Sequence, residues 1–338
     1  MQGDRLQDGP NVVISGSLAY DYIMSFPGSY KDHILPDKVH VLSVSFLFDS
    51  LQRLRGGIAG NIAYNLALLG ERPAVVGAGG GDFAPYRVAF DELGIDTELV
   101  ADAPDLLTGS SFMLNDLAGN QIAGFYPGAS VGAAEISISE IASRSRFGVV
   151  GATTLEAMAR HAGEIADVGC KLVYDPSQQL VAATSDDLLA GIERAWAFTG
   201  SDYEFAMLER KTGLSIDAVA DRVPFVVVTY GGEGSTILTG GQRITIPIVA
   251  PAPLVDPTGG GDAYRAGLLK GLLLGLHPRV AGRMAALAAT FAIERYGTQE
   301  HAYDAGQFVE RFEHSFPDFR GTITEASLRT PAPSAPGR

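Results

Sequence analysis

A glycine-rich stretch near residue 260 contains the residues best suited to chemistry. Gly259, Gly260 and Gly261 precede Asp262, and the following run reads as a helix that stops at Gly275. Glycines that open a helix expose backbone N–H groups, and the first helical turn carries partial positive charge. Such a start favours an anion, most often a phosphate. Asp262 beside it is either an N-cap or a general base that takes a proton from an attacking hydroxyl.

A second stretch of this kind precedes a helix predicted over 62–69, which Gly70 ends. Gly56 and Gly57 let a ligand approach the backbone closely. Asn61 is an amide at the start of the helix. Its side chain either caps the helix or binds a polar ligand.

Polar residues also follow two predicted strands. The run 11–16 reads as the first buried strand, and Ser17 and Asp21 come after it. Gln178 and Gln179 follow the strand predicted over 171–174. Because ligands of α/β sheets bind beyond the carboxyl ends of strands, these side chains are candidates for substrate binding. The alternatives are a turn aspartate and an ordinary polar loop.

The elements that must position these residues alternate between strand and helix. Strands are predicted at 74–77, 148–151, 171–174, 195–199 and 224–229, and helices at 82–93, 138–144, 154–168 and 202–210. This alternation is typical of a doubly wound α/β fold with a mostly parallel sheet and helices on both faces.

Two β-rich segments interrupt this order and predict a small lid. Strands are expected at 39–44 and 45–48, and a hairpin at 110–115 and 121–126 with its turn at 116–120. We therefore expect one domain over 11–320, with lid strands inserted at about 22–55 and 108–127. The Pro-rich tail at 331–338 is expected to be disordered.

Composition limits the classes of function. The chain has 338 residues, of which 46% are hydrophobic, and its net charge is −14. That charge argues against a polymeric nucleic-acid partner but permits a small phosphorylated ligand. With Cys170 as the single cysteine, no membrane-length apolar run and a polar start, we expect a cytoplasmic protein without a membrane partner.

The residues 256–267 and 56–63 resemble two motifs of the ribokinase-like (PfkB) carbohydrate and nucleoside kinases, in the order found there. The resemblance implies a ribokinase-like fold with a β-rich lid. It implies Asp262 as the catalytic base, with an anion hole formed by the amides of Gly259, Gly260 and Gly261. It also places Ser17, Asp21, Gly56, Gly57 and Asn61 on the sugar.

Within that family, the run 175–179 is most similar to bacterial adenosine kinases. This similarity implies that Gln178 and Gln179 contact the nucleoside and that Phe112 and Phe125 enclose its base. The alternative for both phenylalanines is packing within the lid.

The similarity to the family also implies ATP and Mg²⁺ as cofactors. Glu204 stands where a magnesium-linked glutamate is usual, acting through water, whereas Ser201 replaces the usual asparagine. The nucleotide loop would include Thr229, Gly231 and Gly234, although Glu233 takes the place of a frequent lysine.

A monovalent-cation site, for K⁺ in some relatives, would lie beside the anion hole. Asp256 and Thr258 are the residues implied for it. Both lie within three residues of Gly259, the first residue of the glycine run.

The leading hypothesis is therefore ATP-dependent phosphotransfer to the 5′-hydroxyl of adenosine, giving AMP in purine salvage, by a homodimer that pairs through its lid. The runner-up is a kinase of a free sugar such as ribose. A third hypothesis is a binding protein without turnover. A serine hydrolase is disfavoured, because Pro127 interrupts the strand that a nucleophile at Ser130 would need.

Overall fold

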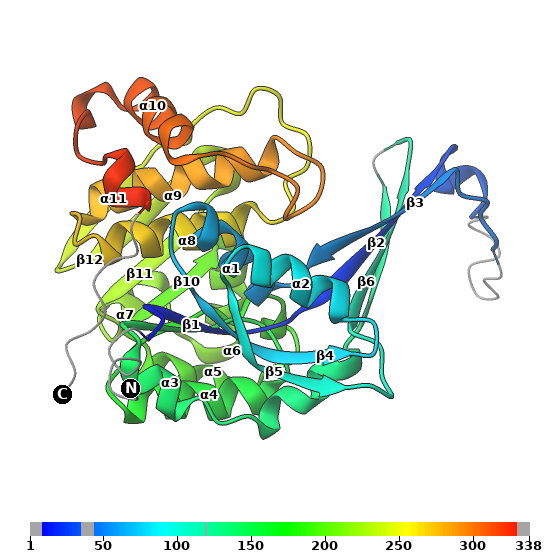
Figure 1. Ribbon diagram of the computed structural model, residues 1–338, viewed down its shortest axis with the longest axis horizontal. Coiled ribbons are helices and arrows are strands. Elements are labelled where there is room, and N and C mark those ends of the chain that lie inside the picture. The colour runs from blue at the N-terminus through cyan, green and yellow to red at the C-terminus, as the bar shows by residue number, and fades with distance from the viewer. Residues whose placement is uncertain (1–8, 35–43, 119, 330–338) are drawn as a thin grey trace, which may run out of the picture.

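The computed structural model describes residues 9–34, 44–118 and 120–329. Most of the strand predicted at 39–44, one residue of the hairpin turn and the tail lie outside the described residues. The chain forms a large sheet between two helical layers and a smaller sheet that projects from one side (Figure 1).

The large sheet confirms the predicted strands and adds strands at both of its ends that were not predicted. Seven neighbouring strands are parallel, and two further strands, each antiparallel to its neighbour, extend the sheet. In spatial order the strands are β13 (Gln242–Ile246), β12 (Ser235–Thr239), β11 (Phe225–Thr229), β10 (Ala197–Ser201), β9 (Lys171–Tyr174), β8 (Phe147–Val150), β1 (Val12–Ser15), β4 (Ala74–Gly80) and β5 (Asp96–Ala103).

Helices cover both faces of this sheet (Figure 1). Alternate residues of β1 enter different cores, Val12 and Ile14 on one face and Val13 on the other. The first core lies under α1 (Ile58–Leu68), α2 (Ala84–Glu92), α8 (Gly260–Leu273) and α9 (Pro278–Ile293). The second lies under α3 (Ser139–Arg144), α4 (Leu155–Asp167), α5 (Ser185–Arg194), α6 (Asp202–Thr212) and α7 (Ile216–Ala220). Outside α9 pack α10 (Ala305–Ser315) and α11 (Glu325–Arg329).

Local capping explains where several helices begin. The side chains of Thr184 and Ser201 each accept a hydrogen bond from the backbone N–H three residues later. The carboxylate of that later residue, Asp187 or Glu204, accepts in turn from the backbone N–H of the N-cap residue. Both are complete capping boxes. In contrast, α1 and α8 begin after Gly57 (φ +88°) and Gly259 (φ +78°), with no side-chain cap. The N-cap glycines of these two helices therefore leave the first backbone N–H groups to other partners, and at α1 Ser17 Oγ accepts from Ile58 N–H.

The lid is a four-stranded sheet whose extent differs from the prediction. Its order is β3 (Ser50–Gly56), β2 (Ala19–Phe26), β6 (Gly109–Asp116) and β7 (Gln121–Tyr126). The hairpin is confirmed. The strand predicted at 45–48 is wrong, since Phe46 and Phe48 lie in a loop and pack their rings around Phe26. Instead β2 forms a long strand directly after β1.

In the part of the chain that the structure describes, every helix is too short or too polar to cross a bilayer.

Candidate active site

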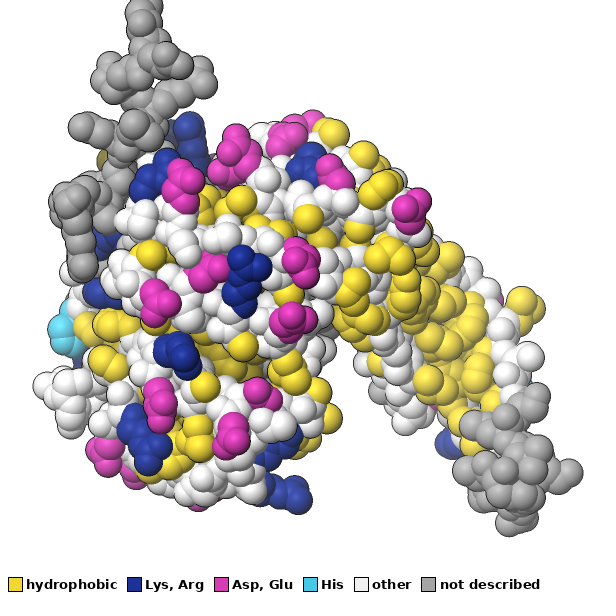
Figure 2. Space-filling model, turned by 90° about the horizontal axis from the view of Figure 1, so that it is seen from below, with side chains coloured by type: hydrophobic (Ala, Val, Ile, Leu, Met, Phe, Trp, Pro, Cys, Tyr) yellow, Lys and Arg dark blue, Asp and Glu magenta, His cyan; other side chains and the backbone are white. Residues whose placement is uncertain are grey.

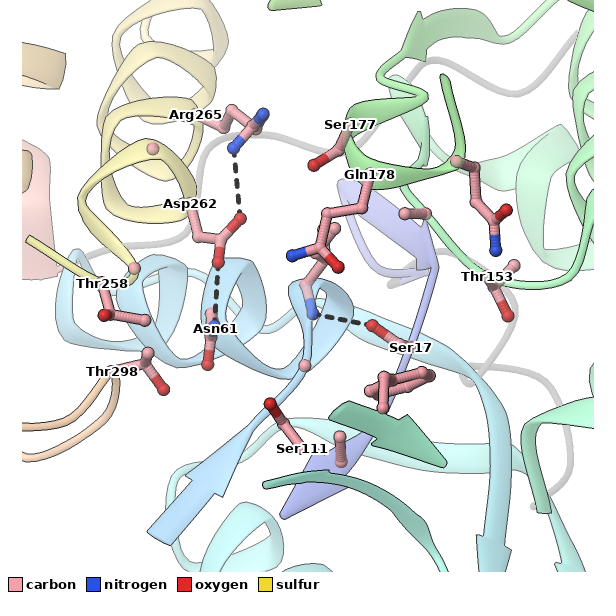
Figure 3. Close-up of a pocket in the computed structure, with 18 of the residues that line it drawn as sticks. Ser17, Asn61, Ser111, Thr153, Ser177, Gln178, Thr258, Asp262, Arg265 and Thr298 are labelled. Carbon is pink, nitrogen blue, oxygen red and sulfur yellow. Dashed lines mark hydrogen bonds and ion pairs between the residues drawn. The ribbon is translucent and has the colours of Figure 1, made fainter. Parts of the chain in front are cut away.

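A cavity of about 560 Å³ lies where the carboxyl ends of the parallel strands meet the lid. Its walls come from loops after β1, β8, β9 and β10, from the starts of α1 and α8, and from the inner face of the lid. In Figure 3, Asp262 and Thr153 lie on opposite sides of this space, with Gln178 and Ser17 between them. The cavity brings together most of the residues predicted from sequence.

Asp262 lies in the first turn of α8 and does not cap the helix. The residue is 8% exposed and lines the cavity. Asn61 Nδ2 donates to Oδ2 at 2.8 Å, and Arg265 Nη1 donates to Oδ1 at 3.1 Å (Figure 3). Burial raises the pKa of Asp262, while Arg265 and Asn61 lower it. A carboxylate with that environment can accept a proton from a hydroxyl in the cavity.

The start of α8 supplies donors for an anion beside Asp262. Gly260 N–H bonds to the Pro257 carbonyl at 3.3 Å, so that amide is partly used within the chain. Gly259 and Gly261 line the cavity, and the amides of Gly261 and Asp262 belong to the first helical turn, which lacks internal partners. This arrangement suits a phosphoryl group next to the base.

The start of α1 faces the same cavity. Ser17 Oγ accepts a hydrogen bond from Ile58 N–H at 3.1 Å, so Ser17 both lines the cavity and holds the helix. Asn61 lies one turn into α1 rather than at its cap. Gln299 Nε2 donates to Asn61 Oδ1 at 3.0 Å, which fixes the orientation of the amide that bonds to Asp262.

Asp21 lies on strand β2 of the lid, so its interpretation as a turn aspartate is wrong. Its carboxylate lines the cavity, and burial with repulsion from Asp262 and Asp256 raises the pKa of Asp21 to about 7. Gly56 does not line the cavity. A Cβ at Gly56 would lie 2.2 Å from Asp21 Oδ2, so glycine there leaves room for the carboxylate. At Gly57 the positive φ and the Ser17 carbonyl exclude a side chain in the same way.

The two phenylalanines lie on opposite faces of the lid. Phe125 pairs with Ser111, and both line the cavity. Phe112 is the next residue of β6, so it points to the outer face and stacks on Tyr22 with ring centroids 5.0 Å apart. The structure therefore places Phe112 outside the cavity, unlike the predicted substrate contact, whereas Phe125 stays a candidate.

Gln178 and Gln179 line the cavity from a 3₁₀ turn after β9. The turn begins at Ser177, whose φ of +43° is the one positive value at a non-glycine among the described residues. Such strained backbone is often found at functional sites. The turn thus carries two amides that can donate to and accept from one ligand.

A second cavity of about 310 Å³ adjoins the first, and the two share Thr229, Gly261 and Tyr264. Gly231 and Gly234 line it beside Thr229, as the nucleotide-loop prediction requires. Its remaining wall is largely apolar and comes from Ile248, Val249, Pro251, Leu254, Pro257, Ala286, Ala289 and Ile293. This cavity suits a flat base, with its phosphates directed to the start of α8.

Residues near the shared wall fit a magnesium nucleotide in part. Ser201 and Glu204 line the first cavity, and Glu204 Oε2 accepts from Ser201 N–H at 2.6 Å within the capping box. Among the described residues there is no group of three metal-binding side chains. This donor set fits Mg²⁺, which is commonly held by one or two carboxylates, water and substrate phosphates.

The residues predicted for a monovalent cation divide between two places. Thr258 lines the first cavity, whereas Asp256 lines neither. Asp256 Oδ1 accepts from Thr258 N–H at 2.9 Å, and Oδ2 accepts from Gly297 N–H at 3.1 Å. Both oxygens of Asp256 therefore hold the loop that leads into α8.

Sequence reasoning missed Arg265 and Asp175. Arg265 lines the cavity and contacts the carboxylates of Asp262 and Asp175, and Asp175 is fully buried. The sequence does indicate the contact between Arg265 and Asp262, because residues three apart on a helix are neighbours. The contact of Arg265 with Asp175 could not be predicted, because Asp175 follows a different strand far away in the sequence.

The environment of Ser130 rules out a nucleophile elbow. Ser130 lies in a 3₁₀ turn after Pro127 rather than between a strand and an α-helix. Its buried hydroxyl has no hydrogen-bond partner among the described residues, so no histidine there activates it.

The doubly wound sheet, the small lid and the buried carboxylate at a glycine-led helix start define a ribokinase-like phosphotransferase. The model of the pfkB family carbohydrate kinases matches residues 28–305. The chain belongs to this family and is an ATP-dependent kinase.

Individual relatives support the same assignment. A nucleoside kinase of Methanothermobacter thermautotrophicus is 32% identical over 311 residues, which cover 91% of this chain and 97% of that protein. The structure of Burkholderia thailandensis nucleoside kinase in complex with inosine has a TM-score of 0.83 at 36% identity, covering 90% of this chain and 98% of that one. A ribokinase of Thermotoga maritima, at 19% identity and a TM-score of 0.75, shares the fold, with 90% of this chain and 99% of that one covered.

Proposed function

We propose that the chain transfers the γ-phosphoryl group of ATP to the 5′-hydroxyl of a purine nucleoside, with adenosine as the acceptor. The observation that carries the phosphotransfer is the buried Asp262 carboxylate, held by Asn61 and Arg265 at the start of α8. The nucleoside is supported by Phe125, Gln178 and Gln179 in the cavity and by the similarity of the chain to nucleoside kinases.

The roles follow from the order of groups along the cavity. Asp21, Gly57 and Asn61 bind the ribose. Asp262 takes the proton of the 5′-hydroxyl while the 5′-oxygen bonds to the γ-phosphorus of ATP. The bond from that phosphorus to the bridging oxygen breaks, and ADP leaves with this oxygen. The amides at the start of α8 stabilise the charge of the transferring group. When bound, Mg²⁺ neutralises phosphate charge near Glu204.

The sugar-kinase alternative uses the same chemistry. A free sugar would leave Phe125 and the Gln178–Gln179 turn without contacts, and these residues line the cavity. Because amides both donate and accept, the turn can bind a 6-amino or a 6-oxo purine, so inosine belongs in the test beside adenosine.

The test is ADP release from Mg-ATP with adenosine, inosine, guanosine, cytidine or ribose, for the wild type and Asp262→Asn. We expect turnover with purine nucleosides and a loss of about 10²–10⁴-fold in the variant, the usual contribution of a general base. Turnover with ribose alone would refute the nucleoside assignment. A variant that keeps full activity would refute the role of Asp262.

A further inference from the structure

The charged groups around the base are unevenly balanced. Asp21, Glu204 and Asp262 line the first cavity, whereas Arg265 is the one cationic side chain among the described residues that line either cavity. ATP brings further negative charge to this place. A base surrounded in this way would favour its protonated form unless a positive charge lies close to it.

Arg265 lies in contact with that base. Its Nη1 donates to Asp262 Oδ1 at 3.1 Å, and its side chain is 12% exposed. A Cβ at Gly261 would lie 3.0 Å from the same nitrogen, so the guanidinium lies close over the first turn of α8. The arginine therefore acts at the point where the anion donors and the base meet.

Asp175 holds the other side of the guanidinium. Its carboxylate contacts Arg265 Nε and its side chain has no exposed surface. Asp175 does not line either cavity, so it acts on the reaction only through Arg265. Thr199 Oγ1 accepts a third contact from Arg265 Nε at 3.4 Å. A planar guanidinium fixed at both ends has a defined orientation.

We propose that Arg265 is a positioning residue which, held by Asp175, orients the Asp262 carboxylate and keeps it ionised for proton transfer. The inference rests on the proposed role of Asp262 as base. The charged groups that face Asp262 are Arg265 from its own helix, Asp175 after β9, Glu204 from α6 and Asp21 from β2. Of these, only Arg265 favours the ionised form.

The experiment is the pH dependence of kcat/KM from pH 5 to 9, with Mg-ATP and the acceptor that the wild type uses best. Arg265→Gln removes the positive charge, so Asp262 stays protonated to higher pH and the acidic limb moves up by about one pH unit. Asp175→Asn removes a negative charge beside Arg265, so the guanidinium stabilises the ionised Asp262 more strongly. The acidic limb should then move to lower pH. Arg243→Gln is the control, because Arg243 pairs with Asp217 on the surface.

Opposite shifts in the two variants support the proposal. Limbs that stay in place, or that move in the same direction, would overturn it even if activity falls, because a purely structural role would lower activity without moving the limb. If Arg265→Gln does not fold, the single variants Arg265→Lys and Asp175→Asn test the proposal instead. Lysine keeps the positive charge, so the acidic limb of Arg265→Lys should stay at the wild-type pH. Asp262→Asn separates the two ideas: an active variant refutes the base itself, whereas an inactive one with unmoved limbs in the others refutes only the role of Arg265.

Discussion

At the scale of single residues, the face of a strand decides function in the lid. Phe125 and Phe112 are both aromatic and both partly exposed, at 55% and 39%. Only Phe125 lines the cavity, because Phe112 stacks on Tyr22 on the other face. The pair therefore offers a matched test of base stacking.

Replacing Phe125 by alanine should raise KM for adenosine by roughly five- to a hundredfold, since stacking on a base contributes about 1–3 kcal/mol. Phe112→Ala should leave KM within about twofold of the wild type. Steady-state kinetics with adenosine and with ribose checks both. Equal effects of the two variants, or an equal loss with ribose, would contradict the assignment of Phe125 to the base.

The residue scale also shows what local sequence can and cannot predict. The start of α8 was predictable, because its glycines, its carboxylate and the helix after them are adjacent in the chain. The placement of Phe112 was not, since it depends on the register of β6 against β2, where Phe112 pairs with Tyr22. The contact of Arg265 with Asp175 joins a helix to a different strand, which no spacing reveals.

At the scale of elements, α8 and α9 pack with little space between their backbones. A Cβ at Gly267 would lie 2.7 Å from the Met284 carbonyl oxygen and 2.8 Å from Ala285 Cα. These are backbone atoms, so α9 would have to move. Because Gly267 has no side chain, α8, which carries Asp262, can pack closely against α9.

Gly267→Ala should destabilise the fold by about 1–3 kcal/mol, the usual cost of overpacking a core. Gly163 in α4 is the control, because a Cβ there would meet nothing within 4 Å. Gly163→Ala should be stabilising by about 0.5–1 kcal/mol, since alanine is the better helix former. Urea unfolding of both variants measures the difference. A stable Gly267→Ala protein would mean that α9 shifts at little cost.

Element boundaries were predicted unevenly for a physical reason. The buried parallel strands were found because their apolar runs are uninterrupted. The edge strands β13 and β5 and the lid strand β3 were missed, since they mix exposed residues with buried ones. The strands β12 and β2 were also missed, although most of their residues are buried. The strand predicted at 45–48 is a loop, because Phe46 and Phe48 pack their rings against Phe26 instead of joining a strand ladder.

At the scale of the whole molecule, the lid leaves apolar side chains uncovered. Figure 2 shows hydrophobic side chains gathered along it, and Leu51, Ile122 and Tyr126 are 63%, 42% and 42% exposed. Strands β3 and β7 form the two edges of this sheet, and open edges pair readily with other strands. These features support the expectation of a homodimer joined through the lid.

Light scattering of the wild type should therefore give twice the 35.5 kDa mass of the chain. Ile122→Glu should shift the protein towards the monomer, because a charge would be buried in an apolar interface. Val181→Glu is the control, since Val181 is 70% exposed on the body rather than the lid. A monomeric wild type at micromolar concentration would contradict the prediction.

The cavity takes its walls from two sheets, and this has a consequence for how such an enzyme changes over evolution. The body supplies Asp262, Gly261 and the adjoining second cavity, whereas the lid supplies Asp21, Ser111 and Phe125. Substitutions on the inner face of the lid can exchange one acceptor for another while the apparatus of transfer stays intact. Selectivity can thus drift by small steps, each of which passes through a working enzyme.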